Sequence, residues 1–337
     1  MTRLSDGANG SLRYSIAGEG HCRLGLEVLS PFPAAGTLTA GREADEAAAG
    51  GAGMSSSVPP PKVVLWVSRK GSTFAHPRPG ELSPVETERV TALRHANHLV
   101  LLLDVCGFGT LADKQGDAFG AFELPSYDFR VKLSQPVDVA FNLNRSIVGI
   151  HAVDILTAAL VFSTKGGLPG LNLSCATTVA GSRRTHIGRS SNSWCEINAV
   201  VSTNETAAAA LSAALVSGSS QHGSTSGNLL LPKLGAVAVL GSIASWESIV
   251  LAPRFDMSGY FSFVFGGLKH FDIPDMLAAL PNPAFVSAPL DAMRRPLNAS
   301  TIAKVYSYAR ASNPRLSVDD GEGSVTAALM KWLSSTI

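Results

Sequence analysis

The stretch from Glu196 to Val216 has the residue types of a strand, a sharp turn and a helix. An apolar run with β-branched residues leads into a polar turn, STNET at 202–206, and an alanine-rich segment follows. In acyl-transfer enzymes a turn of this kind can carry the nucleophile, in the pattern Gly-x-Ser-x-Gly. Here Asn204 stands at the place of the serine, and a carboxamide is a poor nucleophile because its nitrogen lone pair is delocalised.

The two glycines of that pattern are also replaced, by Ser202 and Thr206. Glycine is needed there because strand and helix approach closely and the backbone is strained, so we expect the strained geometry not to persist. Elsewhere in the chain, the glycine pairs spaced four apart enclose Ala118, Leu168 and Thr225. None of these residues is a nucleophile, so the sequence contains no intact elbow.

Two serines near expected strand ends, Ser202 and Ser245, are the best substitutes for the missing nucleophile, and His270 is the best substitute base. Each has a structural interpretation that we favour. The serines suit turns, and His270 precedes a helix that we expect to begin at Pro274, because proline suits the first helical position. Asn204 itself suits the start of the helix that follows it, as a cap.

Length and composition suit one large globular domain or two small ones, and we expect one. The chain has 337 residues, 45% of them hydrophobic and 16% charged, and a net charge of +1, which favours neither nucleic acid nor an acidic membrane as a partner. The four cysteines have no metal-type spacing, and no cofactor or metal is predicted. We found no signal peptide and no apolar run of membrane-spanning length, so we expect an intracellular protein, cytoplasmic or mitochondrial and not secreted.

The elements that must position the turn alternate between strands and helices. An opening β-hairpin is expected within 11–33, buried strands at 62–68, 98–109, 196–203, 233–242 and 283–289, and helices at 86–96, 146–162, 207–216, 301–311 and 325–337. This alternation predicts an α/β fold with a mostly parallel central sheet flanked by helices on both faces. The domain is expected to span 11–337.

Long low-complexity insertions interrupt this pattern at 34–61, 163–193 and 217–228. They are rich in small and polar residues that bury little apolar surface, so we expect them to be flexible. The middle insertion carries Arg183, Arg184 and Arg189, which makes it the best candidate contact for a partner, with protein and RNA equally open.

Several segments together resemble the α/β-hydrolase family that includes acetyl xylan esterases and related bacterial carbohydrate esterases. They are LLLDVCGFG (101–109), NRSIVGIHAVDIL (144–156), GSIASWESIV (241–250), and GLKHFDIPDMLAAL with PNPAFVSAPLDAMRRPL (267–297). The resemblance implies the α/β-hydrolase fold and a Ser, Asp, His triad in that chain order. It places the catalytic acid at Asp291 and the nucleophile at Asn204.

The histidine of that triad is missing. His270 is the last histidine of the chain and precedes Asp291, while the loop where the resemblance places the base reads SVDDGEGSV (317–325). A carboxylate there is a weak base near neutral pH, with an unperturbed pKa of about 4. The triad is degenerate, and Asp291 is then a remnant acid or a turn residue kept for structure.

We therefore expect a catalytically degenerate hydrolase that acts as a structural or interaction module, within a larger ribonucleoprotein or organellar assembly as one option. The alternative is an active esterase or acyl hydrolase with a rearranged site that uses Ser202 or Ser245 and His270. A third option is binding of a small acyl or sugar ligand without turnover.

Overall fold

The computed structural model describes residues 2–6, 11–17, 23–31, 61–68, 82–105, 146–164, 196–219, 231–256 and 262–337. Its centre is one nine-stranded sheet. The strands are β1 (Thr2–Asp6), β2 (Leu12–Ala17), β3 (Arg23–Leu29), β4 (Lys62–Val67), β5 (His98–Asp104), β6 (Ile197–Thr203), β7 (Leu234–Leu240), β8 (Ala284–Ser287) and β9 (Leu316–Asp319).

The strands lie in the order β1-β2-β3-β5-β4-β6-β7-β8-β9. The first three and β5 pair antiparallel, and every pair from β5 to β9 is parallel. The expected opening hairpin is confirmed as β2 and β3. The α/β class and the mostly parallel central sheet are confirmed as well.

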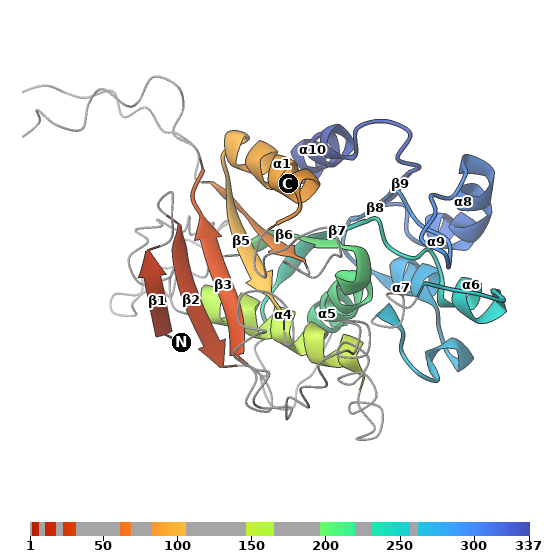
Figure 1. The fold of residues 1–337 in the computed structure, drawn as a ribbon, viewed down its shortest axis with the longest axis horizontal. Helices are drawn as coiled ribbons and strands as arrows, with labels where there is room; N and C mark the ends of the chain where they lie inside the picture. Colours follow the sequence, from red (N-terminus) through yellow and green to blue (C-terminus); the bar gives the residue numbers. More distant parts are fainter. Residues whose placement is uncertain are drawn as a thin grey trace, which may run out of the picture.

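Helices cover both faces of the sheet (Figure 1). They are α1 (Pro84–His95), α4 (Ile147–Thr164), α5 (Ala207–Ser219), α6 (Trp246–Leu251), α7 (Ile273–Ala279), α8 (Ala299–Val305), α9 (Ser307–Ser312) and α10 (Val325–Thr336), with short 3₁₀ turns η4 (Asn204–Thr206) and η7 (Gly267–Lys269). α4, α5 and α7 belong to the apolar core on one face, and α1 and α10 to the core on the other.

Strand β4 shows why the parallel strands are apolar throughout. Val63, Leu65 and Val67 belong to the core under α4 and α5, whereas Val64 and Trp66 belong to the core under α1 and α10. Successive side chains of a strand point to opposite faces, so a strand covered on both sides must be apolar at every position.

Some boundaries differ from those expected. The sheet begins at β1, before the expected start at residue 11, and β9 and α6 were not expected. The helices α4 and α5 run on to Thr164 and Ser219, so they include the first residues of the expected insertions at 163–193 and 217–228. The rest of those insertions, and nearly all of 34–61, lie outside the described residues.

The helix expected at 301–311 is two helices, α8 and α9, joined at Tyr306. Tyr306 is fully buried, and its backbone leaves the helical region there. Among the described helices, none is long and apolar enough to cross a lipid bilayer.

Candidate functional site

The expected turn between strand and helix is present at the carboxyl end of β6. The strand ends at Thr203, η4 follows at once, and α5 begins at Ala207. Asn204 has a φ of 52°, in the left-handed region that side chains other than glycine rarely adopt. Our expectation that the strained geometry would be lost without the glycines is therefore wrong. Asparagine is among the residues that tolerate this region best.

Buried hydroxyl groups occupy the two positions where the Gly-x-Ser-x-Gly pattern has glycine. Ser202 and Thr206 are both almost fully buried. The Thr206 hydroxyl lies 2.9 Å from the carbonyl oxygen of Thr203 and 3.1 Å from that of Val67, and it donates to them. Thr206 thus ties the turn to the end of the neighbouring strand β4. This cross-strand hydrogen bond helps to hold the turn in the absence of glycine.

The Asn204 side chain is held by an arginine that the sequence did not single out. Arg294 Nη2 donates to Asn204 Oδ1 at 2.9 Å, and Arg294 Nη1 lies 2.7 Å from Glu205 Oε1. The Arg294 side chain is 22% exposed and that of Glu205 only 9%, so this ion pair is largely shielded from water. One guanidinium therefore bridges two consecutive residues of the turn.

Arg294 comes from the loop that follows β8, where the acid was expected. Its φ is 61°, so its backbone is also left-handed. No local pattern marks this residue, because its two partners lie 89 and 90 positions away in the sequence. Gly241, at the end of β7, makes room beside them: a Cβ there would lie 3.2 Å from Asn204 Oδ1.

The Asp291 carboxylate forms its hydrogen bonds and its ion pair with residues of its own loop. Its carboxylate accepts hydrogen bonds from the backbone N–H groups of Met293 and Arg295, both at 2.8 Å, and forms an ion pair with the Arg295 side chain at 2.7 Å. Burial opposes its ionisation, but these hydrogen bonds hold the pKa of Asp291 below its ordinary value. These contacts are those of a turn-forming carboxylate.

The segment 317–325, where the base was expected, contacts β8 and the residue that follows β8. Ser287 Oγ donates to Asp319 Oδ2 at 2.6 Å, and Asp320 Oδ1 accepts from the backbone N–H of Glu322. Gly321 has a φ of 81° and packs closely against Ala288. The carboxylates of Asp319 and Asp320 thus take part in local structure.

The substitute residues do not form a hydrogen-bonded pair. Ser202 is fully buried, and its hydroxyl has no partner within the described part of the chain. Ser245 caps α6, accepting from the backbone N–H of Ser248 at 3.1 Å. His270 is exposed at the end of η7. Across the described ranges, no hydrogen bond joins either serine to His270, so the rearranged site stays a prediction.

The arginines predicted to contact a partner belong to the middle insertion. Arg183, Arg184 and Arg189 lie outside the described residues. Within the residues that are described, no group of three or more His, Cys, Asp or Glu side chains is arranged to hold a metal ion.

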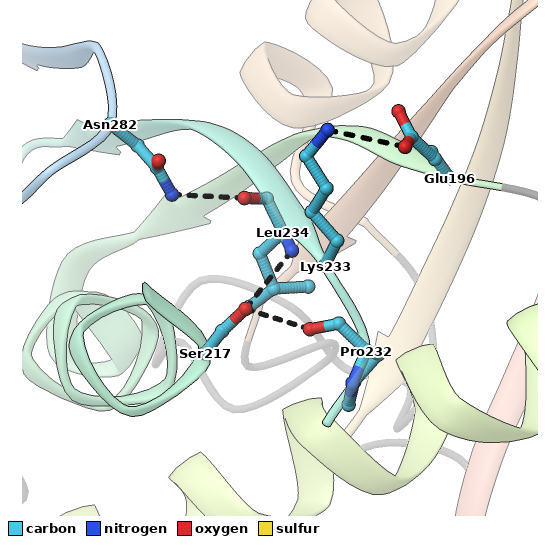
Figure 2. A network of polar contacts seen from close by, with 6 residues as sticks. All are labelled: Glu196, Ser217, Pro232, Lys233, Leu234 and Asn282. Carbon is cyan, nitrogen blue, oxygen red and sulfur yellow. Dashed lines mark hydrogen bonds and ion pairs between the residues drawn. The ribbon is translucent and has the colours of Figure 1, made fainter. Parts of the chain in front are cut away.

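A second polar network lies where the parallel strands begin, at the edge of the sheet opposite to the Asn204 turn (Figure 2). We call this the amino edge, and the edge at which the parallel strands end the carboxyl edge. Ser217 Oγ accepts from the backbone N–H of Leu234 at 3.1 Å and donates to the carbonyl of Pro232 at 2.7 Å. Asn282 donates to the Leu234 carbonyl, and Lys233 pairs with Glu196 on the surface. These contacts fasten the end of α5 to the start of β7. Their role is structural.

No protein-family model matches the sequence, and no curated protein matches it either. Among solved structures, a lipase/esterase from Lactobacillus plantarum matches with a TM-score of 0.51 and 9% identity, over 96% of this chain and 97% of that one. A dienelactone hydrolase from Anabaena variabilis matches with a TM-score of 0.43 and 11% identity, over 97% and 96% of the two chains.

An esterase domain from a Rhodothermus marinus protein matches with a TM-score of 0.44 and 12% identity, over 96% of each chain. The likeness to the lipase/esterase, together with the sheet order, confirms the expected α/β-hydrolase fold. At such low identity the comparison concerns the fold alone, because one fold hosts many activities.

Proposed function

We propose that this chain is a catalytically degenerate relative of the α/β-hydrolases that include acetyl xylan esterases, and that it serves as an interaction or structural module. The observation that carries the proposal is the bridge from Arg294 to Asn204 and Glu205. It occupies the residue where a hydrolase of this fold has its nucleophile.

The chemistry of the bridge supports this proposal. Acyl transfer at an elbow needs a nucleophile whose proton passes to a neighbouring base. Asn204 supplies a carboxamide instead of a hydroxyl. The side chain bound to it is a guanidinium, which stays protonated in proteins and cannot accept that proton. With no histidine after His270 in the sequence, the chain also lacks an imidazole in the order that the fold uses.

The test is reaction of the purified protein with a fluorophosphonate probe, together with hydrolysis of a simple aryl acetate. An active serine esterase is the positive control, and the heat-denatured protein is the negative control. We expect no labelling and no turnover above the denatured sample. Labelling that requires the folded state and is lost in Ser202→Ala or Ser245→Ala would instead establish the rearranged esterase.

The variant Asn204→Ser sharpens the test, because it restores the hydroxyl at the elbow and nothing else. We expect it to remain unlabelled and inactive, since no histidine follows Asp291 in the sequence to take the serine proton. Appreciable hydrolysis by this single variant would reveal a hidden base and would contradict the proposal.

We further propose that the arginines of the middle insertion, Arg183, Arg184 and Arg189, contact the partner. Binding of single-stranded RNA can be measured by fluorescence anisotropy at several salt concentrations. Salt-dependent binding by the wild type that is lost in the triple Arg→Gln variant would assign RNA as the partner. Absence of RNA binding by the wild type would remove RNA and leave a protein partner, and equal binding by both proteins would show that these arginines are not the contact.

A further inference from the structure

A buried histidine stands at the amino edge of the sheet, where β5 begins. His98 is the first residue of that strand and is only 7% exposed. Val100 and Leu102 belong to the apolar core under α1 and α10, and alternate side chains of a strand share a face, so His98 points to the same side. Imidazole is the side chain that changes its charge near neutral pH, so a buried imidazole couples the fold to acid.

The Nδ1 atom of His98 is buried without a hydrogen-bond partner among the described residues. In a neutral imidazole one ring nitrogen carries the proton and the other has a free lone pair. Because Nδ1 has no acceptor within reach, the neutral ring of His98 carries its proton on Nε2. Protonation of the ring would add an N–H at Nδ1 that has no acceptor, and an unsatisfied buried donor is costly.

The cations around His98 also oppose its protonation. Lys62, the first residue of β4, is the direct partner of His98 in the parallel register of the two strands. Helix α1, which lies beside β5 (Figure 1), carries Arg89, Arg94 and His95 in its second half. Burial first, and the charge of Lys62 second, hold the pKa of His98 below its ordinary value.

The carboxylates of the neighbouring elements are engaged elsewhere. Glu27 of β3 accepts a hydrogen bond from an arginine of β2. Glu86 and Glu88, in the first half of α1, accept hydrogen bonds from threonine side chains of β6 and α10. The charged side chain of α10 is a cation, Lys331. Among these elements, no carboxylate is therefore placed to stabilise a protonated His98.

The sign of the resulting pH dependence is fixed by this lowered pKa. In the unfolded chain His98 has its ordinary pKa of about 6.5. Between that value and the lower pKa of the folded state, the unfolded chain binds more protons, so stability falls as the pH falls through this window. Above the ordinary value the imidazole is neutral in both states, and the loss is absent.

Three segments meet around His98. The chain leaves α1 through Asn97, whose φ is 62°, and enters β5 at once. Arg94 Nε donates to the carbonyl oxygen of Ser30, directly after β3, at 2.8 Å. The side chain of His98 thus lies where the end of α1, the end of β3 and the starts of β4 and β5 come together.

We propose that His98 is an acid-sensitive switch, whose protonation loosens the corner formed by residues 94–98 and Lys62. At neutral pH the uncharged ring packs under α1 and the corner is closed. As the pH falls, the charged ring is expelled toward water and the end of α1 separates from the start of β5. This inference goes beyond the proposed function and holds whether or not the Asn204 turn catalyses a reaction.

The first test is an NMR titration of the histidine rings in the full chain, with the His98 signal assigned through its bonds to the backbone. We expect a midpoint below about 6.5 for His98 in the wild type. Lys62→Gln removes the neighbouring charge at an exposed residue, so the midpoint is expected to rise in this variant. A wild-type midpoint at or above about 6.5 would overturn the proposal.

The second test is urea denaturation at about pH 7.5 and about pH 5. We expect the ratio of folded to unfolded protein to fall on acidification by about threefold or more beyond the fall in His98→Leu, which cannot be protonated. His95→Gln is the matched control, because His95 is exposed in the last turn of α1, and it should decline as the wild type does. Lys62→Gln should decline less than the wild type, which keeps the test valid if His98→Leu fails to fold. An equal decline in the wild type, His98→Leu and Lys62→Gln would overturn the switch.

Discussion

At the amino edge of the parallel sheet, Ser217 and Asn282 hydrogen-bond backbone groups at the start of β7 (Figure 2), whereas at the carboxyl edge Arg294 binds the side chains of Asn204 and Glu205. The first network satisfies backbone groups that a buried strand end would otherwise leave unpaired. The second ties side chains together around a strained turn.

The carboxyl edge is also marked by an unusual backbone conformation. Asn204, Gly241 and Ala288 directly follow β6, β7 and β8, and each has a positive φ. Three neighbouring parallel strands thus end in left-handed residues, two of which are not glycine. Such strain gathers at functional sites and persists only where the surroundings enforce it. The carboxyl ends of these three strands therefore concentrate backbone strain around the Asn204 turn.

The largest effect is expected at the amino edge, from Gly235→Ala. A Cβ at Gly235 would lie 2.1 Å from the carbonyl oxygen of Asn198 in β6, and a backbone atom cannot move aside cheaply. We expect a loss of about 3 kcal/mol in the free energy of unfolding, measured by urea denaturation. Gly323→Ala is the control, because a Cβ there meets no atom within 4 Å. Equal stability of the two variants would show that β6 and β7 are not so closely spaced.

The next effect is expected at the carboxyl edge, from Arg294→Met. It removes the guanidinium that pairs with the largely buried Glu205 carboxylate, which we expect to cost about 2 kcal/mol of unfolding free energy. The double variant Glu205→Gln/Arg294→Met also removes the buried carboxylate charge, so it should be more stable than Arg294→Met alone.

Arg295→Met is the matched control for Arg294→Met. Arg295 is 74% exposed in its pair with Asp291, so its loss should cost less than about 1 kcal/mol. A result in which the two arginine variants are equally destabilised would mean that the bridge at the elbow is no stronger than a surface pair.

A smaller effect is expected from Ser217→Ala. It leaves the backbone N–H of Leu234 without its hydrogen-bond acceptor in a buried place, which we expect to cost about 1 to 2 kcal/mol. Ser219→Ala is the control, because the Ser219 hydroxyl makes only an exposed hydrogen bond to Val216 in the same helix. Equal stability of Ser217→Ala and Ser219→Ala would remove the structural role assigned to the amino-edge network.

The smallest effect has the opposite sign and tests the strain itself. Ala288 has a φ of 50°, which costs an alanine about 1 kcal/mol that glycine does not incur. The variant Ala288→Gly relieves this strain, but part of the gain in stability is offset by the greater conformational freedom of glycine in the unfolded chain. We therefore expect Ala288→Gly to stabilise the protein slightly, by about 0.5 kcal/mol. Ala279→Gly, at the exposed end of α7, should instead destabilise it, and a loss at both positions would argue against strain at the carboxyl edge.

The core strands and most helices were predictable from the sequence because their signals are local. A run such as KVVLWV is apolar at every position, and this alone indicates a strand buried on both faces. Two short elements, β9 and α6, were missed because their local signal is too weak. β9 has only 4 residues and α6 only 6, too few to establish a period.

In the candidate site, too, local features were predictable from the sequence and contacts between distant segments were not. The sequence alone determined that asparagine stands at position 204, where the resemblance places a nucleophile, and that no histidine follows Asp291, because residue types and their order are read directly from the chain. Only the tertiary structure decided that Asn204 keeps a left-handed backbone, that Arg294 reaches it, and that α6 exposes Val250 and Leu251. These features depend on packing between segments distant in sequence, and no local pattern of residues records which segments meet.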